Sequence, residues 1–461
     1  MYRLAPHGTA YNMPLALRQM GRLNKAALRS TIDAICRRHE AFRTTFVMTG
    51  EGPVQIISPF HSPHWVEVDL KLLPREQRQQ EAIRLVEKES IQPFDLEKGP
   101  LVRFQLIEIE PEDHVLMLTM HHIIGDQWSF GVIGHEFALF YNAFSRGEPP
   151  SPKPIPLQYA DYAVWQRRCL TDDWLSTQAD YWQKKLAGLS KLSLPTDYPR
   201  PVVQTFNGSH RMLELPTSLI ERLKQFSAEH NATVFMTLLA CFQILLRRYS
   251  GQTDVAVGSP IANRTQSAVE SIIGSFVNTL VLRTDLSGDP TFIELMARVR
   301  ETALEAYTNQ DFPFDKLVEM MHSSRDQSSA PLVQVLFNVP NAPIGEINVQ
   351  GLSWVPFEVE TQAAQFDLSL TIDTELSRKA YLTFNTDLFE PQTAERMLGQ
   401  YKILLKSALA NPQSKLSELP TVTAPERQQM LQDWNCTQRA YPQSECVPQL
   451  FEAQVKRTPD A

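Results

Sequence analysis

The segment from residue 114 to residue 144 constrains the fold of this chain more strongly than any other. It begins with a short apolar run, His114-Val115-Leu116-Met117-Leu118-Thr119-Met120, which is followed by the polar and glycine-containing sequence His121-His122-Ile123-Ile124-Gly125-Asp126. An apolar run of this length that ends in turn-forming residues is typical of a buried strand. Residues 128–144 then repeat apolar side chains at nearly helical spacing. The segment therefore predicts a strand, a loop and a helix, with two imidazoles and a carboxylate at the strand end.

The two adjacent histidines have different surroundings in this prediction. Successive side chains of a strand point to opposite faces, so only one of His121 and His122 can face a reactive cavity. The other must pack or form a hydrogen bond. Histidine suits general-base chemistry because its unperturbed pKa of about 6.5 lies near neutrality. The pair predicts one reactive and one supporting side chain, although two histidines can equally end a strand and satisfy backbone groups there.

The carboxylate of Asp126 has two possible uses in such a loop. It can accept a hydrogen bond from an imidazole, or it can form a structural salt bridge with an arginine. A metal site is disfavoured, because adjacent strand residues diverge and no third ligand stands at a familiar spacing. We therefore predict no metal ion at this loop.

The composition excludes several classes of protein. With 43% hydrophobic and 21% charged residues, the 461-residue chain resembles globular proteins of roughly two to four domains. Its net charge of -8 argues against a nucleic-acid partner. No apolar run approaches the roughly 20 residues of a membrane span, and the N-terminus lacks the apolar core of a signal peptide. Five scattered cysteines form no CxxC pair, so we predict a reducing, cytoplasmic location.

Two α/β patterns follow one another along the chain. The first predicts helices over residues 24–39, 75–90 and 128–144 and strands over residues 41–47, 53–58, 65–70, 101–109 and 114–121. The second predicts helices over residues 219–230, 233–249, 292–307 and 393–409 and strands over residues 254–258, 278–284, 334–339, 368–373 and 380–385. Residues 145–176 include a proline cluster and predict a linker or surface crossing. The pattern indicates two α/β lobes of comparable size and a C-terminal tail.

Six short motifs, in the expected order, resemble those of condensation domains of non-ribosomal peptide synthetases. The His-His-x-x-x-Asp-Gly signature of that family is matched at His121, His122 and Asp126, but Gln127 stands in place of the glycine. The other motifs are similar to residues 38–46, 159–165, 273–279 with Arg283, 310–314, and Arg325-Asp326 with residues 331–337. Asn309 stands where the sixth motif has a histidine. The resemblance covers about residues 4–425.

The resemblance implies a fold and an activity. Members have two chloramphenicol-acetyltransferase-like α/β lobes that form a V with a central tunnel. Donor and acceptor peptidyl carrier proteins present thioesters on 4'-phosphopantetheine arms, and the domain itself binds no cofactor. The acceptor amine attacks the donor thioester, which forms an amide and releases the donor thiol. We therefore expect an acyltransferase that forms peptide bonds and is monomeric as an excised domain.

The resemblance also implies roles for individual residues. His122 is the tunnel-facing group that either takes a proton from the amine or orients it, and His121 supports it. Asp126 is implied to pair with an arginine, for which Arg43 and Arg283 are the candidates. Positions along the substrate channel are implied for Gly125, Trp128, Ser129, Ser275 and Asn278. Residues 258–264 resemble the crossover that latches one lobe onto the other.

Gln127 is the main departure from the signature. A glycine there would permit positive φ or a close approach of the backbone to the pantetheine arm. Glutamine adds bulk and two hydrogen-bonding ends beside the histidine loop. It is either a tolerated variation or a residue that narrows one substrate channel.

The two ends of the chain complete the expected organisation. The first motif of the family is absent, which indicates either a shortened sequence or an atypical start. Residues 433–435 (Asp-Trp-Asn) and residues 450–461 look like the opening of an adenylation domain. We predict an N-terminal lobe over residues 1–170, a C-terminal lobe over residues 171–425, and a linker with the beginning of an adjoining adenylation domain over residues 426–461.

Three alternatives to amide formation follow from the same fold. An epimerization domain shares the signature but deprotonates an α-carbon, and the motif pattern and the adenylation-like tail argue against it. A heterocyclization domain is disfavoured because that family has aspartates in place of the two histidines. A non-catalytic domain that recruits a partner protein is the third alternative, because Gln127 and Asn309 depart from the motifs. Residues 123–129 look like those of the subtype that joins an L-configured donor to an L-configured acceptor.

Overall fold

The computed structural model describes most of the chain as two compact units. The described residues are 8–50, 52–321, 328–340, 348–357, 362–375, 377–438, 440 and 444–461. The first unit is Met1–Leu419 and contains all the sheets, whereas the second unit is Pro420–Ala461. Arg325 and Asp326, which resemble part of the seventh motif, lie outside the described residues.

The first sheet of the large unit has the strand order β11-β1-β6-β5-β4. Its strands are β1 (Asn12–Met20), β4 (Trp65–Asp69), β5 (Val102–Glu110), β6 (Asp113–His121) and β11 (Ser353–Pro356). A turn between residues 110 and 113 joins β5 and β6 as an antiparallel hairpin. β11 comes from the second half of the chain and pairs with β1, so two distant segments share this sheet.

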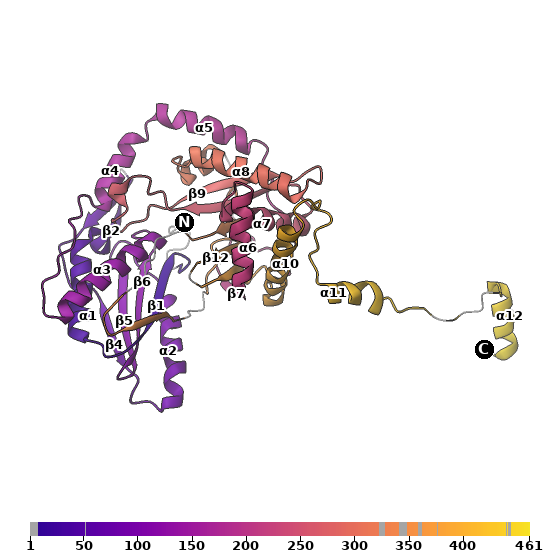
Figure 1. Ribbon diagram of the computed structural model, residues 1–461, viewed down its shortest axis with the longest axis horizontal. Coiled ribbons are helices and arrows are strands. Elements are labelled where there is room, and N and C mark those ends of the chain that lie inside the picture. Colours follow the sequence, from indigo (N-terminus) through magenta and orange to yellow (C-terminus); the bar gives the residue numbers. More distant parts are fainter. Residues whose placement is uncertain are drawn as a thin grey trace. The chain divides into compact units, whose positions relative to one another are not determined.

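Helices cover both faces of the first sheet. On one face, α1 (Lys25–Arg38) and α3 (Gln127–Ser145) bury Ile32, Ile35 and Phe137 against Leu118 and the neighbouring strands. On the other face, α2 (Arg75–Ser90) buries Ala82 and Val86 in a smaller cluster. Figure 1 shows β5 and β6 between α2 and the helix pair. The period of two along β6 therefore divides its side chains between two hydrophobic clusters.

The second sheet has the order β7-β13-β12-β10-β8-β9. Its strands are β7 (Gly208–Glu214), β8 (Asp254–Ile261), β9 (Asn278–Asp285), β10 (Val335–Asn338), β12 (Leu368–Asp373) and β13 (Lys379–Asn385). It packs with α6 (Thr217–Glu229), α7 (Val234–Ser250), α8 (Phe292–Thr308) and α10 (Pro391–Ala410). Residues 236–246 of α7 are buried without interruption, so this helix forms the centre of the largest hydrophobic core.

The remaining elements of the large unit lie outside the two main sheets. They are the 3-10 helix Glu40–Arg43, the hairpin of β2 (Thr44–Thr49) and β3 (Gly52–Ile57), α4 (Tyr159–Cys169), α5 (Asp172–Leu186), the 3-10 helix Ser267–Val269 and α9 (Phe314–Met320). Figure 1 shows α4 beside the part that contains the first sheet and α5 continuing toward α8. α4 and α5 thus connect the two sheet-containing parts.

The long predicted elements are confirmed, within a few residues at their ends. The prediction of a linker over residues 145–176 is wrong in its second part, where α4 and the beginning of α5 lie. The proline cluster over residues 149–156 is indeed without helix or strand, but α4 buries Tyr162 and thereby gains tertiary support that its weak sequence pattern does not predict. β1, β7 and β11 were not predicted, because exposed and polar residues interrupt their alternation.

The described residues of the small unit include three short helical segments. These are α11 (Ala424–Gln428), the π-helical turn Gln429–Asp433 and α12 (Val447–Arg457). In α12, Val447, Phe451 and Val455 recur at a spacing of four and are exposed, so they form one apolar face. All five cysteines are free thiols. Within the described residues, no single helix is long and apolar enough to cross a membrane.

Replacing Phe242 with alanine is expected to destabilise the large unit by about 3–5 kcal/mol, because the ring is fully buried in α7. It stacks on Phe337 at a centroid distance of 5.6 Å. Val202→Ala, at a position that is 88% exposed, serves as the control and is expected to change stability by less than about 0.5 kcal/mol. Urea unfolding followed by circular dichroism measures both. Equal unfolding midpoints for the two variants would contradict this packing.

Candidate active site

The histidine loop begins where β6 leaves the first sheet. The backbone N–H of His121 donates to the Leu101 carbonyl at 3.0 Å, and that of His122 donates to the Tyr11 carbonyl at 2.8 Å. The backbone is therefore fixed from both sides at the end of β6, where the two histidines follow one another. A side chain at the end of a central strand is held more rigidly than one on a free loop.

His121 is the buried member of the pair. Its side chain is packed with Tyr11 and Phe94, at centroid distances of 6.2 and 6.1 Å. Its Nδ1 accepts a hydrogen bond of 3.1 Å from the Ile123 backbone N–H, so the ring proton belongs on Nε2. Burial, with a smaller effect of His122, lowers the pKa of His121 to about 4. His121 is therefore a neutral supporting group near pH 7.

His122 is the accessible member of the pair. It is partly exposed, and its imidazole forms no hydrogen bond or ion pair with any described residue. Only its backbone N–H is bound. The expected division into one buried and one available histidine is thus present in the structure, with His122 free to contact a reactant.

The carboxylate of Asp126 is fully engaged with protein donors. Its Oδ1 accepts from the backbone N–H and the hydroxyl of Ser129, at 2.9 and 2.7 Å, and so caps the N-terminus of α3. Its Oδ2 accepts from the Phe276 N–H at 3.1 Å. Arg264 Nη2 lies 3.0 and 3.2 Å from the two oxygens. Because protein donors surround both oxygens of this buried group, Asp126 has no free lone pair for proton abstraction.

Arg264 connects the histidine loop to the segment between β8 and β9. Its Nη1 donates to the carbonyls of Val269 and Ile272 at 2.7 and 2.6 Å, and the guanidinium lies 4.1 Å from the Phe276 ring centroid. Burial lowers the pKa of Arg264, and the carboxylate of Asp126 opposes that shift. Asp126 and Arg264 therefore form a buried ion pair between residues 138 positions apart.

The predicted partners of Asp126 are wrong. Arg43 binds Glu40 and the Ser58 carbonyl, at 3.2 and 2.9 Å. Arg283 lies on β9 and binds Asp254 at 2.7 Å as well as carbonyls at the end of α5. Both guanidinium groups are thus occupied elsewhere, and Arg264 takes the position that the family resemblance gave to one of them.

Trp128 and Ser129, which follow Asp126 in α3, also contact the segment between β8 and β9. Trp128 Nε1 donates to the Glu270 carbonyl at 2.9 Å, and the Ser129 hydroxyl lies 3.2 Å from the Gly274 carbonyl. Both were predicted to line the substrate channel. Ser129 is instead completely buried in the cap of α3, and Trp128 binds the 3-10 region of the second half.

Tyr159, the first residue of α4, also contacts the segment between β8 and β9. Its hydroxyl donates to the Ser275 carbonyl at 2.7 Å. A Cβ atom at Gly274 would lie only 2.1 Å from the Tyr159 ring, so only glycine permits this approach. Burial raises the pKa of Tyr159 to about 12, so the hydroxyl stays protonated as a donor. The segment over residues 264–276 is therefore held by both α3 and α4.

Asn278, Gly125 and Gln127 were also predicted at or beside the substrate channel, and the structure shows where each of them lies. Asn278 Nδ2 donates to the carbonyls of Gln310 and Phe312, and its Oδ1 accepts from Phe314 N–H, so the side chain fixes the loop before α9. Gly125 is buried, and a Cβ there would meet Met120 Sδ at 2.7 Å. Gln127 is exposed as the first residue of α3. Their contribution to a channel stays a prediction.

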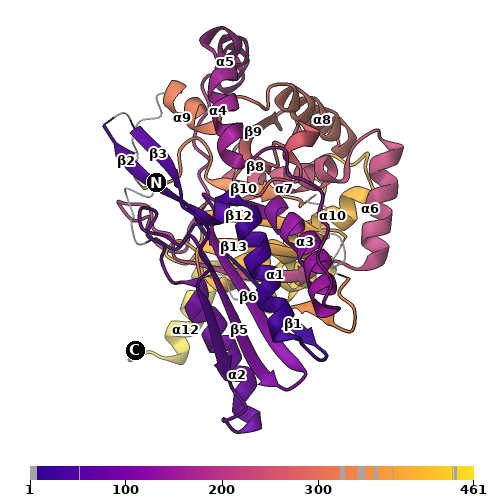
Figure 2. The same ribbon diagram turned by 90° about the vertical axis from the view of Figure 1, so that its left-hand side faces the viewer.

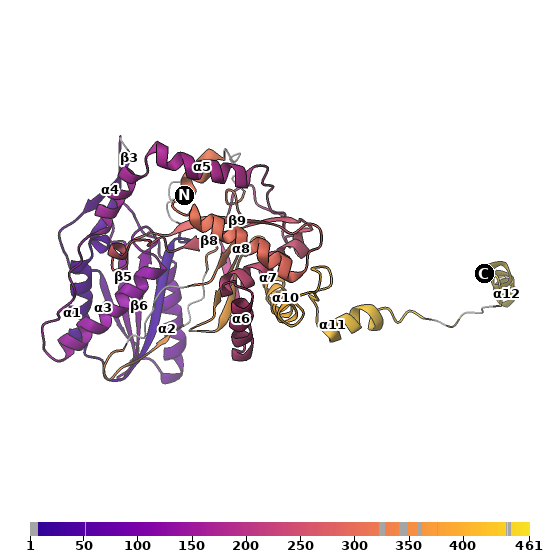
Figure 3. The same ribbon diagram turned by 45° about the horizontal axis from the view of Figure 1, so that its top comes forward.

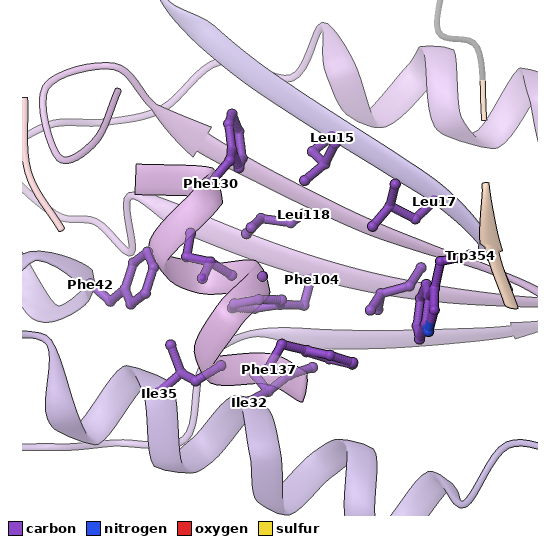
Figure 4. A pocket seen from close by; sticks show the side chains of 13 residues that line it. Leu15, Leu17, Ile32, Ile35, Phe42, Phe104, Leu118, Phe130, Phe137 and Trp354 are labelled. Atoms are coloured by element: carbon purple, nitrogen blue, oxygen red, sulfur yellow. The ribbon is translucent and has the colours of Figure 1, made fainter. Parts of the chain in front are cut away.

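An apolar cavity of about 60 Å³ lies between the first sheet and the helices α1 and α3. Leu118 of β6, Phe130 and Phe137 of α3, and Trp354 of β11 are among its lining residues, as Figure 4 shows. Such a lining favours apolar contents and offers no acid or base. Among the described residues, no group of three or more acidic, histidine or cysteine side chains could hold a metal ion.

Comparison with known proteins agrees with this geometry. The two sheets and their helices have the chloramphenicol-acetyltransferase-like fold, and two solved structures are similar to this chain. The X-domain from teicoplanin biosynthesis is 27% identical with a TM-score of 0.81, over 90% of this chain and 94% of that one. The SgcC5 protein from Streptomyces globisporus is 28% identical with a TM-score of 0.76, over 89% and 95% of the two chains.

The chain belongs to the condensation-domain family, whose sequence model matches residues 1–431. A component of the linear gramicidin synthase from Brevibacillus parabrevis is 44% identical over 99% of this chain. The chain spans only 6% of the length of that synthase component. The similarity therefore concerns one domain within a much larger protein.

Sequence reasoning missed Arg264, Gly274 and Tyr159 as parts of the site. Arg264 follows Asn263, which has a positive φ of 52°, so a turn directs the guanidinium inward. The available signal was a lone arginine directly after an apolar strand, within the predicted crossover over residues 258–264. Nothing in the sequence pairs it with Asp126, because that pairing depends on how two distant loops meet.

Replacing Arg264 with glutamine is expected to lower the free energy of unfolding by roughly 3–5 kcal/mol, because Asp126 would be left as an unpaired buried charge. Asp126→Asn is expected to have a similar effect. The double variant should be less destabilised than the sum of the single variants. Urea unfolding measures all three, and Arg146→Gln, which breaks an exposed pair with Glu148, is the control with an effect below about 1 kcal/mol. Strict additivity of the two single effects would show that the pair is not coupled.

The stability of the large unit is expected to depend on His121 between about pH 6.5 and pH 4. The pKa of His121 is lower in the folded chain than in an unfolded one, so the unfolded state binds more protons in this window. Stability is therefore complete above pH 6.5 and falls, by up to roughly 3 kcal/mol from this group, as the pH drops toward 4. Titration of the ¹⁵N-labelled histidines by NMR checks the pKa directly. A His121 pKa near 6.5 would contradict the buried neutral state.

Proposed function

We propose that this domain forms amide bonds between two carrier-bound substrates, as a condensation domain of a non-ribosomal peptide synthetase. The single observation that supports it most is the accessible His122 imidazole beside an Asp126 carboxylate that is fully engaged by protein donors. This arrangement leaves one basic group available to reactants. The similarity to a linear gramicidin synthase supports the same activity.

The proposed reaction needs two thioesters and no redox partner. The α-amine nitrogen of the acceptor attacks the carbonyl carbon of the donor thioester, and the new C–N bond forms as the C–S bond breaks. The amine loses one proton and the departing thiolate gains one, so atoms and charge balance. His122 either accepts the proton from the amine or orients the amine for attack, and holding both reactants together supplies a large part of the acceleration.

In this proposal, Asp126 shapes the site and does not act on the substrate. Its contacts with Ser129, Phe276 and Arg264 fix the end of the histidine loop and the start of α3. The loop in turn determines the direction of the His122 side chain. Loss of activity in an Asp126 variant would therefore reflect a displaced imidazole, and its stability should fall in parallel.

The partners follow from the proposed reaction. Donor and acceptor carrier proteins would present substrates on phosphopantetheine arms, along a tunnel between the two lobes, and the domain would bind no cofactor itself. Residues 426–461, with the apolar face of α12, would be the linker and the beginning of an adenylation domain. We also propose that the excised domain is monomeric and acts in a reducing cytoplasm, in keeping with its free thiols.

Incubation of the chain with a loaded donor carrier and a loaded acceptor carrier is expected to yield an acceptor-bound amide, detected by mass spectrometry of the intact carrier. His122→Ala should lower the rate by about 10²–10⁴ if the imidazole transfers a proton. His61→Ala, at an exposed position far along the sequence from the loop, is the matched control and should keep the rate of the unchanged chain.

Two results would redirect the proposal. Racemised carrier-bound amino acid in the absence of an acceptor would indicate epimerization. The absence of amide product from any matched pair, together with tight binding of a partner protein, would indicate a recruiting domain. The X-domain, which is similar in structure to this chain, has been solved in a complex with OxyB, so partner binding by a domain of this fold has a precedent.

A further inference from the structure

The chain that leaves α2 lies against the buried histidine of the loop. α2 packs on β1, β5 and β6, and Figure 2 and Figure 3 show it beside β5 and β6. We call residues 89–94, at the end of α2 and just beyond it, the α2 exit. Phe94 of this segment is buried and packs on the His121 imidazole, at a centroid distance of 6.1 Å and an interplanar angle of 85°. The α2 exit therefore closes one side of the space that His121 occupies.

Arg103 of β5 holds the α2 exit in place. Its guanidinium donates to the Gln92 carbonyl at 2.9 Å and pairs with the Glu89 carboxylate. Its Cζ also lies 3.8 Å from the centroid of the Phe94 ring. The last carbonyls of a helix have no partners within the helix, and a positive charge is favoured at that end, so a fork of donors suits this position. One side chain thus fixes both the end of α2 and the ring that packs on the imidazole.

Asn12 of β1 holds the same segment from a second strand. Asn12 lies directly opposite His121 in the pairing of β1 with β6. Its Nδ2 donates to the carbonyls of Ser90 and Gln92, both at 2.8 Å. β1 and β5 are the two neighbours of β6 in the first sheet. Because the Gln92 carbonyl accepts from both Asn12 and Arg103, the α2 exit is tied to both strands that flank β6.

The contacts of His121 require a neutral imidazole. Its Nδ1 accepts the Ile123 backbone N–H at 3.1 Å, whereas a protonated imidazole donates from both nitrogens. Protonation would therefore place two N–H groups against each other and release the start of the histidine loop. Burial lowers the pKa of His121 to about 4, and Phe94 is one of the rings that bury it. The titratable and charged groups on the elements around the imidazole are Tyr11, His122, Glu89 and Arg103.

We propose that Arg103 and Asn12 are positioning residues for the reaction, because they hold the α2 exit against His121 and so keep water from the imidazole that anchors the histidine loop. Both act through Phe94 and His121 and need no contact with a reactant. An ionised group is disfavoured where water is excluded, so loosening the α2 exit favours the imidazolium and the loss of its bond to Ile123. The effect on rate rests on the proposed function, whereas the effect on His121 does not.

The protonation of His121 is the direct test. Arg103→Met keeps a long apolar stem and removes every donor. In this variant the pKa of His121, from NMR titration of the ¹⁵N-labelled histidines of the full chain, is expected to rise from about 4 to about 6. Asn12→Leu should shift it in the same direction. Arg103→Lys, which keeps the charge and loses the fork, should give a value between those of the unchanged chain and Arg103→Met.

The rate of amide formation should become more sensitive to acid in Arg103→Met. With a His121 pKa of about 6, only about a quarter of the molecules keep a neutral imidazole at pH 5.5. The rate at pH 5.5 relative to that at pH 7.5 is therefore expected to fall about fourfold further than in the unchanged chain. The KM for both carrier-bound substrates at pH 7.5 should not change, because nearly every His121 is neutral there.

Arg78→Met is the matched control. Arg78 donates to the carbonyls of Lys71 and Leu73, each at 2.9 Å, and pairs with Glu110 at 3.0 Å, near the start of α2. Its removal deletes a comparable set of contacts between an arginine, backbone carbonyls and a carboxylate, away from the α2 exit. The control should lose stability much as Arg103→Met does. It should keep a His121 pKa of about 4 and the pH dependence of the unchanged chain.

The outcomes separate this inference from the proposed function. A His121 pKa that stays at about 4 in Arg103→Met and Asn12→Leu overturns it, and so does an equal rise in Arg78→Met. A raised pKa without any change in the rate ratio overturns the positioning role. If the unchanged chain forms no amide, the proposed function fails, and the NMR titration still decides whether the α2 exit keeps His121 neutral.

Discussion

The buried ion pair between Asp126 and Arg264 is the interaction on which the rest of this structure depends. Asp126 ends the histidine loop and begins α3, whereas Arg264 follows the strand β8 of the other sheet. Two charges removed from water are costly unless each finds several partners. Here they share donors and acceptors with Ser129, Phe276 and the 269–274 backbone. The ion pair therefore helps, together with apolar packing, to fix the histidine loop against the segment that follows β8.

The two histidines show how one short sequence can separate support from chemistry. The strand period directs His121 into an aromatic environment, where burial keeps it neutral and where Ile123 fixes its tautomer. His122 follows the last residue of β6, is partly exposed, and its imidazole has no hydrogen-bond or ion-pair partner among the described residues. The supporting residue packs on two aromatic rings and accepts a hydrogen bond, whereas the imidazole of the available residue has no hydrogen-bond partner among the described residues. This contrast, rather than the presence of two imidazoles, distinguishes a reactive loop from an ordinary strand end.

Sequence patterns predicted those features of the fold and the site that depend on the local spacing of side chains. The strand β6, the helix α3 and the division into one buried and one partly exposed histidine all follow from side-chain spacing, and the structure contains them. The partner of Asp126 could not be predicted in this way. Arg43, Arg264 and Arg283 are equivalent in sequence terms, and the choice among them depends on the meeting of two loops 138 residues apart. The requirement for glycine at position 274 likewise depends on a tertiary contact, because the Tyr159 ring occupies the space that a Cβ atom would need.

The strand β11 has a consequence for how such domains can be recombined. Its four residues complete the edge of the first sheet by pairing with residues 17–20 of β1, and Trp354 packs on Phe137 at 5.4 Å. A hybrid that joined the first half of this chain to the second half of a relative would insert a foreign strand into its own sheet. The described strands keep their native neighbours only if residues 12–385 stay together, and the compact unit that contains them ends at Leu419. Exchange between relatives should therefore preserve that unit intact.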